Sequence, residues 1–122
     1  MRTPTSPDHA LQWWRRALAR RLDRVDQDTP ESGWFRTRAA PGSRIWLPAR
    51  LWIESPVDWS TGELTGPELY RLEIAGRLIT DQSRIEEKWL FLRPVSFPQW
   101  QWLQARHALH HGIETRPSLF GS

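Results

Sequence analysis

Residues 33–54, GWFRTRAAPGSRIWLPARLWIE, decide how this chain folds. From Arg44 to Ile53, apolar residues alternate with arginine, tryptophan and proline. Period-2 alternation of this kind predicts a β-strand with two chemically different faces. Ala40-Pro41-Gly42-Ser43 supplies the proline and glycine that a tight turn requires. We therefore predict that residues 33–54 form a β-hairpin.

The two faces of this hairpin differ in chemistry. We expect one face to be core, with Ile45, Leu47, Ala49, Leu51 and Ile53 from the second arm. Matching the two arms by polarity gives the other face Trp34, Arg36, Arg38, Arg44, Trp46, Arg50 and Trp52. Pro48 has no N–H to donate, so the second arm is expected to be an edge strand or to be bulged there.

A helix is predicted before the hairpin. Ser6 suits the N-cap, Pro7 suits the first helical position, and an apolar 3–4 spacing continues to about Val25. The stripe consists of Leu11, Trp14, Leu18, Leu22 and Val25. The opposite side carries Trp13, Arg16, Arg20 and Arg24. Either this basic side is a contact surface, or Trp13 packs under a neighbouring loop with the arginine stems over it.

Two further regular segments follow the hairpin, and a helix ends the predicted fold. Residues 70–74 and 77–79, separated by Ala75-Gly76, predict a second hairpin. Residues 85–92 are ambiguous between helix and strand, and the alternation of Trp89 and Phe91 favours a strand. A helix is predicted from Phe97 to His111, with a capping box from Ser96 and a stop at Gly112.

These elements predict an α+β fold. We expect a small, strongly bent antiparallel sheet or an SH3-like partial barrel, flanked by an N-terminal and a C-terminal helix. Residues 1–6 are expected to be a flexible tail, 7–112 a single domain, and 113–122 an extended tail. The order of the strands in the sheet and the oligomeric state stay open.

Composition narrows the class of protein. The 122 residues carry a formal net charge of +3, nine tryptophans and no cysteine. Lys88 is the only lysine, and arginine is the cation suited to planar, stacked contacts. No apolar run is long enough to cross a membrane and no secretory signal is visible, so we expect a cytoplasmic protein. Nine indoles cannot all be isolated surface residues, so many must build a core or an interface.

Catalytic motifs are missing from the sequence. There is no phosphate-binding glycine loop and no nucleophile elbow, and no pair of carboxylates has a spacing that points to acid–base chemistry. His107, His110 and His111 could hold a metal ion, but histidines at a helix C-terminus are also explained by the helix dipole. We therefore expect no enzyme activity, no cofactor and no bound metal.

The face that combines indoles and guanidiniums predicts a binding surface. Single-stranded nucleic acid is held by aromatic side chains that stack on bases and by cations that follow the backbone. Trp34, Trp46 and Trp52 with their neighbouring arginines supply both. The alternative is that one of the helices covers this face and the arginines stack on the indoles inside the fold.

Two stretches resemble known proteins. Residues 116–120, Arg-Pro-Ser-Leu-Phe, resemble the peptide by which bacterial replication and repair proteins dock on the sliding clamp. Ser118, Leu119 and Phe120 match the family pattern, whereas Arg116 and Pro117 stand where it has glutamine and leucine. From Pro48 to Leu64, P-x-R-x-W-x-E-x-P-x-D-x-x-T-G-E-L resembles small proteins encoded by phages and prophages. That resemblance implies a protein that acts by binding host machinery.

Two hypotheses follow. In the first, this is a non-catalytic, phage-type accessory protein that binds single-stranded nucleic acid through the hairpin face and docks on replication machinery through residues 116–120. In the second, the same surface inhibits a host protein complex, such as a defence nuclease. Neither hypothesis involves a membrane.

Overall fold

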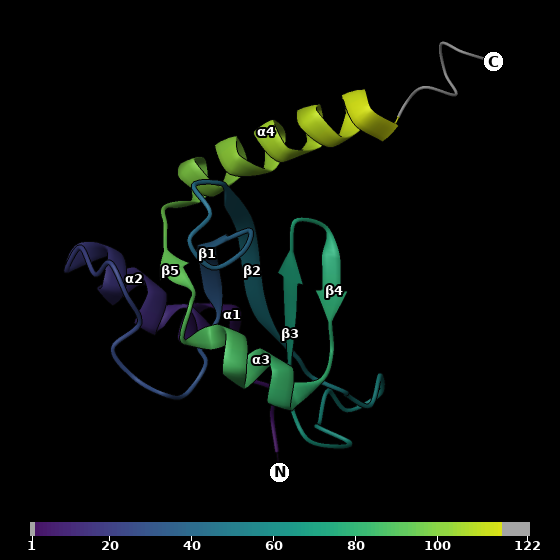
Figure 1. Ribbon diagram of the computed structural model, residues 1–122. Coiled ribbons are helices and arrows are strands. Elements are labelled where there is room, and N and C mark those ends of the chain that lie inside the picture. The colour runs from purple at the N-terminus through teal and green to yellow at the C-terminus, as the bar shows by residue number, and fades with distance from the viewer. Residues whose placement is uncertain (1, 116–122) are drawn as a thin grey trace.

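The chain forms an open five-stranded sheet with helices at both of its faces (Figure 1). A computed structural model describes residues 2–115, and side chains as far as Leu109. Its elements are α1 (Pro7–Ala10), α2 (Gln12–Ala19), β1 (Gly33–Arg38), β2 (Trp46–Glu54), β3 (Leu69–Ile74), β4 (Arg77–Ile79), α3 (Gln82–Trp89), β5 (Arg93–Pro94) and α4 (Phe97–Thr115). The strand order is β4-β3-β2-β1-β5, and neighbouring strands are antiparallel. The predicted α+β class is confirmed, and the sheet does not close into a barrel.

The first hairpin forms as predicted, with a longer connection. β1 and β2 pair so that Trp34 faces Arg50 and Arg38 faces Trp46 across the ladder. The Ser43 N–H donates to the Ala40 carbonyl at 3.0 Å, which closes the expected turn. Because β2 begins only at Trp46, Arg44 lies in the connecting loop and not on the sheet face. Ile45 is 64% exposed for the same reason, so its assignment to the core is wrong.

Pro48 lies in a central strand, not in an edge strand. β2 has β1 on one side and β3 on the other. The Pro48 carbonyl accepts from the Ala75 N–H, so its nitrogen also faces the β3–β4 turn. The ladder between β2 and β3 ends at Ala49, one residue before that point. Pro48 is therefore tolerated because it lies just beyond the last pair that would need its N–H.

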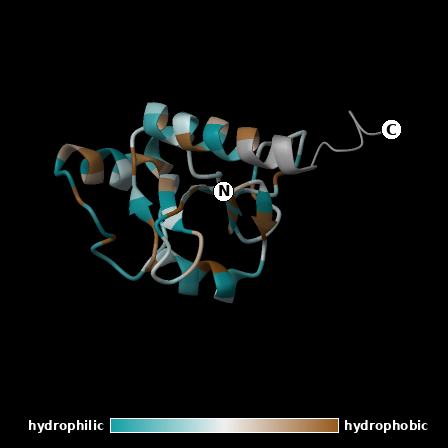
Figure 2. Ribbon diagram, turned by 45° about the horizontal axis from the view of Figure 1, so that its top comes forward, coloured by the Kyte–Doolittle hydropathy of each residue, from teal (hydrophilic) through white to brown (hydrophobic). Residues whose placement is uncertain are grey.

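The apolar face of the sheet packs against α2 and α3. Phe35, Ala49, Leu51 and Leu72 are completely or almost completely buried there. In the ribbon of Figure 2, apolar residues, coloured brown, interrupt the hydrophilic colouring of α3 and occur on the strands behind it. The helices contribute Trp13, Trp14 and Ala17 from α2, and Ile85 and Trp89 from α3. Trp13 and Trp89 both pack on the Phe35 ring, at centroid distances of 6.2 and 5.4 Å.

The N-terminal helix is shorter than predicted. It is divided at Leu11 into α1 and α2. Ser6 caps α1 and Pro7 occupies its first position, as expected, but α2 ends at Ala19 instead of near Val25. Arg21 takes a positive φ of 54°, which ends the helix. The apolar stripe is still used, since Leu22 and Val25 pack against the core from the loop.

The segment predicted as a strand at residues 85–92 is a helix. Asp81 caps α3 by accepting a hydrogen bond from the Ser83 N–H. Ile85 and Trp89, four residues apart, share the buried side, while Phe91 lies beyond the helix and is 73% exposed. The strand prediction was wrong because the alternation of Trp89 and Phe91 resembles a strand, whereas Asp81 and the i, i+4 pair specify a helix.

The C-terminal helix begins as predicted and extends further. The Ser96 hydroxyl accepts from the Gln99 N–H at 3.3 Å, and the helix continues through Gly112 to Thr115. The expected stop at Gly112, and the extended conformation of residues 113–115, are therefore wrong. Residues 116–122 lie outside the described part of the chain.

The N-terminal segment, which we expected to be flexible, is bonded to the loop after β2. The Arg2 carbonyl accepts from the Leu64 N–H, and both the N–H and the hydroxyl of Thr5 donate to the Glu68 carboxylate. The loop itself is closed by a bridge between Val57 and Leu64.

Candidate functional site

Helix α4 covers the middle of the face that combines arginine and tryptophan. Phe97 lies 5.1 Å from the Trp34 ring, and Leu103 is 6% exposed. Pro48, in the centre of this face, is fully buried. The uncovered parts of the face lie on either side, at Arg38 and Trp46 on one flank and at Arg50 and Trp52 on the other. The expectation that a helix could occupy this face is therefore confirmed for its centre.

The arginines of this face lie on its indoles. The guanidinium carbons of Arg36, Arg38 and Arg93 are 4.2, 4.4 and 5.0 Å from the centroid of the Trp46 ring. Arg50 lies 5.9 Å from the Trp34 ring and 5.2 Å from the Trp52 ring. At these distances cations interact with the ring faces. A base could stack on Trp46 only by displacing a guanidinium, so Trp46 acts here as a support for cations.

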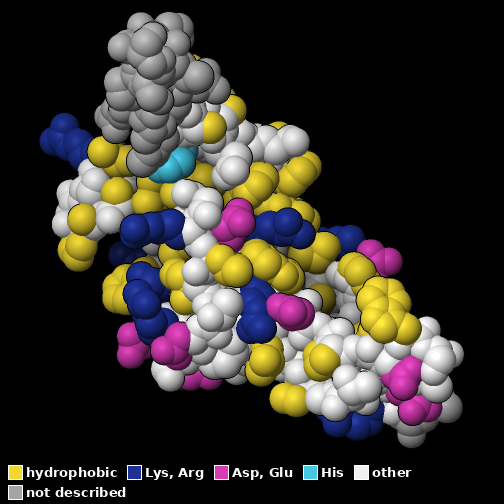
Figure 3. Space-filling model, turned by 90° about the vertical axis from the view of Figure 1, so that its right-hand side faces the viewer, with side chains coloured by type: hydrophobic (Ala, Val, Ile, Leu, Met, Phe, Trp, Pro, Cys, Tyr) yellow, Lys and Arg dark blue, Asp and Glu magenta, His cyan; other side chains and the backbone are white. Residues whose placement is uncertain are grey.

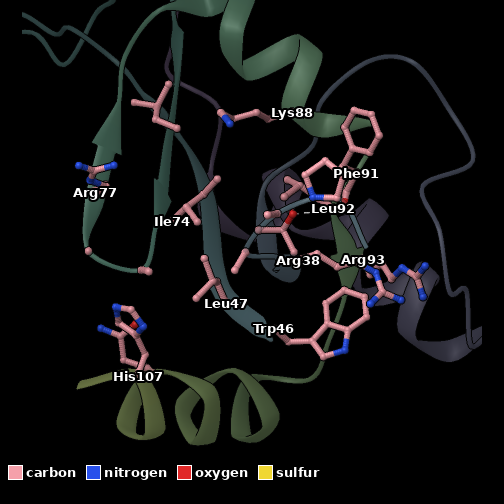
Figure 4. A pocket seen from close by; sticks show the side chains of 18 of the residues that line it. Arg38, Trp46, Leu47, Ile74, Arg77, Lys88, Phe91, Leu92, Arg93 and His107 are labelled. Atoms are coloured by element: carbon pink, nitrogen blue, oxygen red, sulfur yellow. Dashed lines mark hydrogen bonds between the residues drawn. The ribbon is translucent and has the colours of Figure 1, made fainter. Parts of the chain in front are cut away.

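An open groove lies between α3 and α4, beside Trp46 (Figure 4). Its volume is about 1370 Å³. Leu47 and Ile74 of the sheet form its apolar floor, and Phe91 and Leu92 extend this surface on one side. His107 reaches in from α4, and Lys88 faces it from the end of α3 (Figure 4).

The charged side chains of this groove are all cationic. They are Arg24, Arg38, Arg77, Arg84, Lys88 and Arg93, and none of the described lining residues is aspartate or glutamate. Within the described part of the chain, only Arg93 of these six forms an ion pair, with Asp23 at 3.2 Å. The groove thus carries twice the formal net charge of the whole chain, which is +3. We call these six residues and their apolar floor the cationic groove.

The four residues expected on the basic side of the N-terminal helix lie in different environments. Trp13 is 6% exposed, and its indole N–H donates to Asp26 at 3.1 Å, so it packs under the following loop. Arg20 pairs with the same carboxylate, and Arg16 points to solvent. Only Arg24 reaches the cationic groove. A contact role for Arg16, Arg20 or Trp13 stays a prediction, and Trp13 has almost no surface with which to fulfil it.

Other predicted features stay outside this site. The docking peptide with Arg116, Ser118, Leu119 and Phe120, and the side chains of His110 and His111, lie beyond the described residues. Among residues 2–109, no three histidine, aspartate or glutamate side chains come together as a metal site.

Carboxylates with altered pKa values lie away from the groove. Hydrogen bonds from Ser60 lower the pKa of Asp58, and bonds from Ser55 and Thr5 lower that of Glu68. Burial, with smaller effects from Glu31, Glu68 and Glu86, raises the pKa of Tyr70. Each cause is local to the structure around the loop after β2 or to the side of β3. These shifts therefore describe how this end of the molecule is held together.

Sequence reasoning missed most of the groove. Arg77, Arg84, Lys88 and Phe91 come from three separate segments, and no local pattern groups them. In the space-filling view of Figure 3, cationic and apolar side chains are interspersed on the face that carries β4. The available signal was the cap at Asp81, because α3 places Arg84 and Lys88 one turn apart on the same side.

Comparisons with protein families, with curated proteins and with solved structures give no match to this chain. No helix among the described residues combines the length and apolar character needed to cross a membrane.

Proposed function

We propose that this chain is a non-catalytic binding protein that holds single-stranded nucleic acid in the cationic groove. The observation that carries the proposal is the gathering of six cations over an apolar floor, with no carboxylate among the described lining residues. Cations placed together without anions repel one another, and a polyanion relieves that repulsion. This proposal moves the binding surface from the Arg/Trp face of the hairpin to the end of the sheet, where Arg38 and Trp46 of that face and Leu47 of the opposite face all line the groove.

The apolar floor favours a single strand over a duplex. In a duplex the bases are stacked inside and offer the protein mainly their phosphates and edges. Unstacked bases present apolar faces, which Phe91 and the aliphatic floor at Leu47 and Ile74 can cover while the cations meet the backbone. This proposal retains the cytoplasmic location expected from the sequence.

The salt dependence of binding tests the proposal. The double variant Arg84→Gln/Lys88→Gln removes two cations from the groove. For every phosphate that a cation no longer neutralises, the slope of log K against log salt should fall by about 0.7, so the double variant should reduce it by about 1.4. The measurement is fluorescence anisotropy of a labelled oligodeoxythymidylate over a range of salt concentrations.

A matched control removes the same charge elsewhere. Arg15→Gln/Arg21→Gln neutralises two exposed arginines, one in α2 and one just after it, that do not line the groove. The proposal requires this control to keep the wild-type slope. Equal slopes for both double variants would show that only net charge matters, and would reject the groove as the binding site.

A second candidate function, inhibition of a host protein complex, is favoured by Trp59. This indole is 97% exposed at the tip of the loop after β2. The loop is not loose, because Asp58 accepts from the Ser60 N–H and exchanges backbone hydrogen bonds with Gly62 and Glu63. A pre-positioned exposed indole is a typical anchor in protein interfaces.

Trp59→Ala separates the two functions. If the protein acts on a protein partner, this variant should lose a stoichiometric, nuclease-resistant partner from host lysate and keep wild-type affinity for the oligonucleotide. If it acts on nucleic acid alone, no such partner should be retained by the wild-type protein.

A further inference from the structure

Positive charge is most concentrated at the Trp46 end of the cationic groove. Arg38 and Arg93 line the groove there, and Arg36 lies beside them, outside the lining. The guanidinium carbons of all three lie within about 5 Å of the centre of the Trp46 ring. Figure 4 shows Trp46, Arg38 and Arg93 together at this end, away from Arg77 and Lys88. The three arginines come from two strands, since β5 pairs with β1 so that Arg93 faces Arg36.

These guanidiniums have few partners of their own. Arg36 forms no ion pair within the described residues, and its buried Nε has no hydrogen-bond partner there. Arg38 donates to the Ser43 carbonyl, which carries no formal charge. Arg93 uses only its Nη1 nitrogen, which donates to both oxygens of the exposed Asp23 carboxylate at 3.3 and 3.2 Å. Arginine offers five N–H donors, so most donors of this cluster are unused.

The structural alternative is that the cluster only joins β1, β2 and β5 through stacking on Trp46. Attraction to the ring draws each cation to Trp46 separately. It does not account for three cations gathered at one ring, because each is repelled by the other two. A cluster of three cations beside one carboxylate keeps a charge of about +2, which suits a dianion.

We propose that Arg36, Arg38 and Arg93 form a subsite for a terminal phosphate monoester of a nucleic acid strand. A phosphate monoester carries close to two negative charges and presents three acceptor oxygens, whereas an internal phosphodiester carries one charge. Guanidiniums bind such oxygens in pairs, with two parallel hydrogen bonds each. The Trp46 ring, which all three guanidiniums approach, holds them in place before the phosphate arrives. This inference rests on the proposed function of the groove. It adds that one end of the bound nucleic acid lies at the Trp46 end of the groove.

Three forms of one oligodeoxythymidylate test the subsite. They carry only hydroxyl ends, a 5′-phosphate or a 3′-phosphate, and binding is measured by fluorescence anisotropy at constant ionic strength. One phosphorylated form should bind about tenfold more tightly than the hydroxyl form, since charge-assisted hydrogen bonds are the strong ones. Which form gains affinity identifies the end that enters the subsite.

Variants on the two ends of the groove provide the control. Arg38→Gln should remove the advantage of the phosphorylated form. Arg77→Gln, at the other end of the same groove, should weaken all forms by the same factor and keep the advantage. Equal affinity of wild-type protein for all three forms would overturn the subsite and leave the proposed function standing.

Titration with inorganic phosphate tests the subsite independently of the proposed function. If no form of the oligonucleotide binds, the proposed function fails, and calorimetric titration with inorganic phosphate decides on the subsite alone. Binding that Arg38→Gln abolishes and Arg77→Gln preserves would support a phosphate site for another ligand. Absence of any heat of binding would reject the subsite as well.

Discussion

Gly33 lies directly against the indole of Trp14. A Cβ atom at Gly33 would lie 2.5 Å from Cδ1 of the Trp14 ring. The indole N–H of Trp14 donates to the carbonyls of Trp34 and Val95, at 2.9 and 3.0 Å. Trp14 therefore joins α2 to the start of β1 and to the chain just after β5, and only glycine leaves room for it.

Gly33→Ala is expected to lower the free energy of unfolding by about 1–3 kcal/mol, because the new methyl group overpacks a rigid contact. Gly66→Ala is the matched control, since a Cβ there would make an ordinary 3.5 Å contact with Pro56. Urea denaturation of both variants checks the prediction. Equal stability of the two variants would contradict the close packing of Trp14 on Gly33.

Trp89→Phe should destabilise the fold by removing a hydrogen bond as well as side-chain volume. Trp89 is fully buried, and its N–H donates to the Gln27 carbonyl at 2.9 Å. A fully buried carbonyl left without a partner costs about 1–3 kcal/mol, which is the upper bound for the partly buried Gln27 carbonyl. Phe91→Ala, two residues later at an exposed position, should change the stability by less than about 0.5 kcal/mol. Thermal unfolding of the two variants would also test whether residues 85–92 form a helix or a strand. In a strand, Trp89 and Phe91 would share one buried face, and both variants would be destabilised.

Glu68 makes stability depend on pH in the acid range. Hydrogen bonds from the Ser55 hydroxyl and from Thr5 hold the pKa of this carboxyl below its ordinary value of 4.5. The folded protein therefore binds the proton more weakly than the unfolded chain. This contribution is fully present above pH 4.5 and is lost as the pH falls through the folded-state pKa. Glu68→Gln should be less stable than wild type at neutral pH, and the difference should shrink as the pH falls below 4.5 and through the lowered pKa of the folded protein.

The measurement for Glu68 is the free energy of unfolding as a function of pH. Glu87→Gln, an exposed carboxylate of α3, controls for the change in net charge. A constant difference between Glu68→Gln and wild type across the acid range would contradict the assigned hydrogen bonds.

Ala75, in the β3–β4 turn, has a backbone conformation that alanine rarely adopts. Ala75 and Gly76 both have positive φ, 51° and 84°, as in a type I′ turn. Asparagine tolerates this conformation better than alanine, so Ala75→Asn should stabilise the protein by about 0.5–1 kcal/mol. Gly76→Ala should destabilise it, although a Cβ there would touch nothing within 4 Å. Opposite shifts in melting temperature would confirm that backbone conformation alone decides both effects.

Phe91 is the exposed aromatic side chain of the cationic groove. If it stacks on a base, Phe91→Ala should weaken oligonucleotide binding by about 1–3 kcal/mol. Trp102→Ala removes an aromatic ring that is 58% exposed on α4 and does not line the groove. Its affinity should equal that of wild type, and a similar loss in both variants would count against stacking at Phe91.

Much of the local structure follows from the sequence. The second hairpin, the cap at Ser6 and the start of α4 at Phe97 form as predicted, and so do the two faces of the first hairpin apart from Arg44 and Ile45. Each depends on contacts between residues close in the chain, such as an alternation, a turn or a cap. Where two local signals competed, as at residues 81–92, the sequence alone favoured the wrong element.

Much less of the proposed binding surface could be predicted from the sequence. Trp34, Arg36, Arg38, Trp46, Arg50 and Trp52 share a face as expected, but α4 covers its centre. The cationic groove gathers Arg24, Arg77, Arg84 and Lys88 from separate segments, which no single pattern could have connected.

The sequence by itself determined which residues of each strand share a face, because side chains in a strand must alternate. Only the tertiary structure decided which parts of those faces stay exposed, because that depends on where α3 and α4 come to rest on the sheet. Trp13 and Trp46 show the difference. Trp13 is buried by packing on Phe35 and Trp89, whereas Trp46 supports three arginines at one end of the groove.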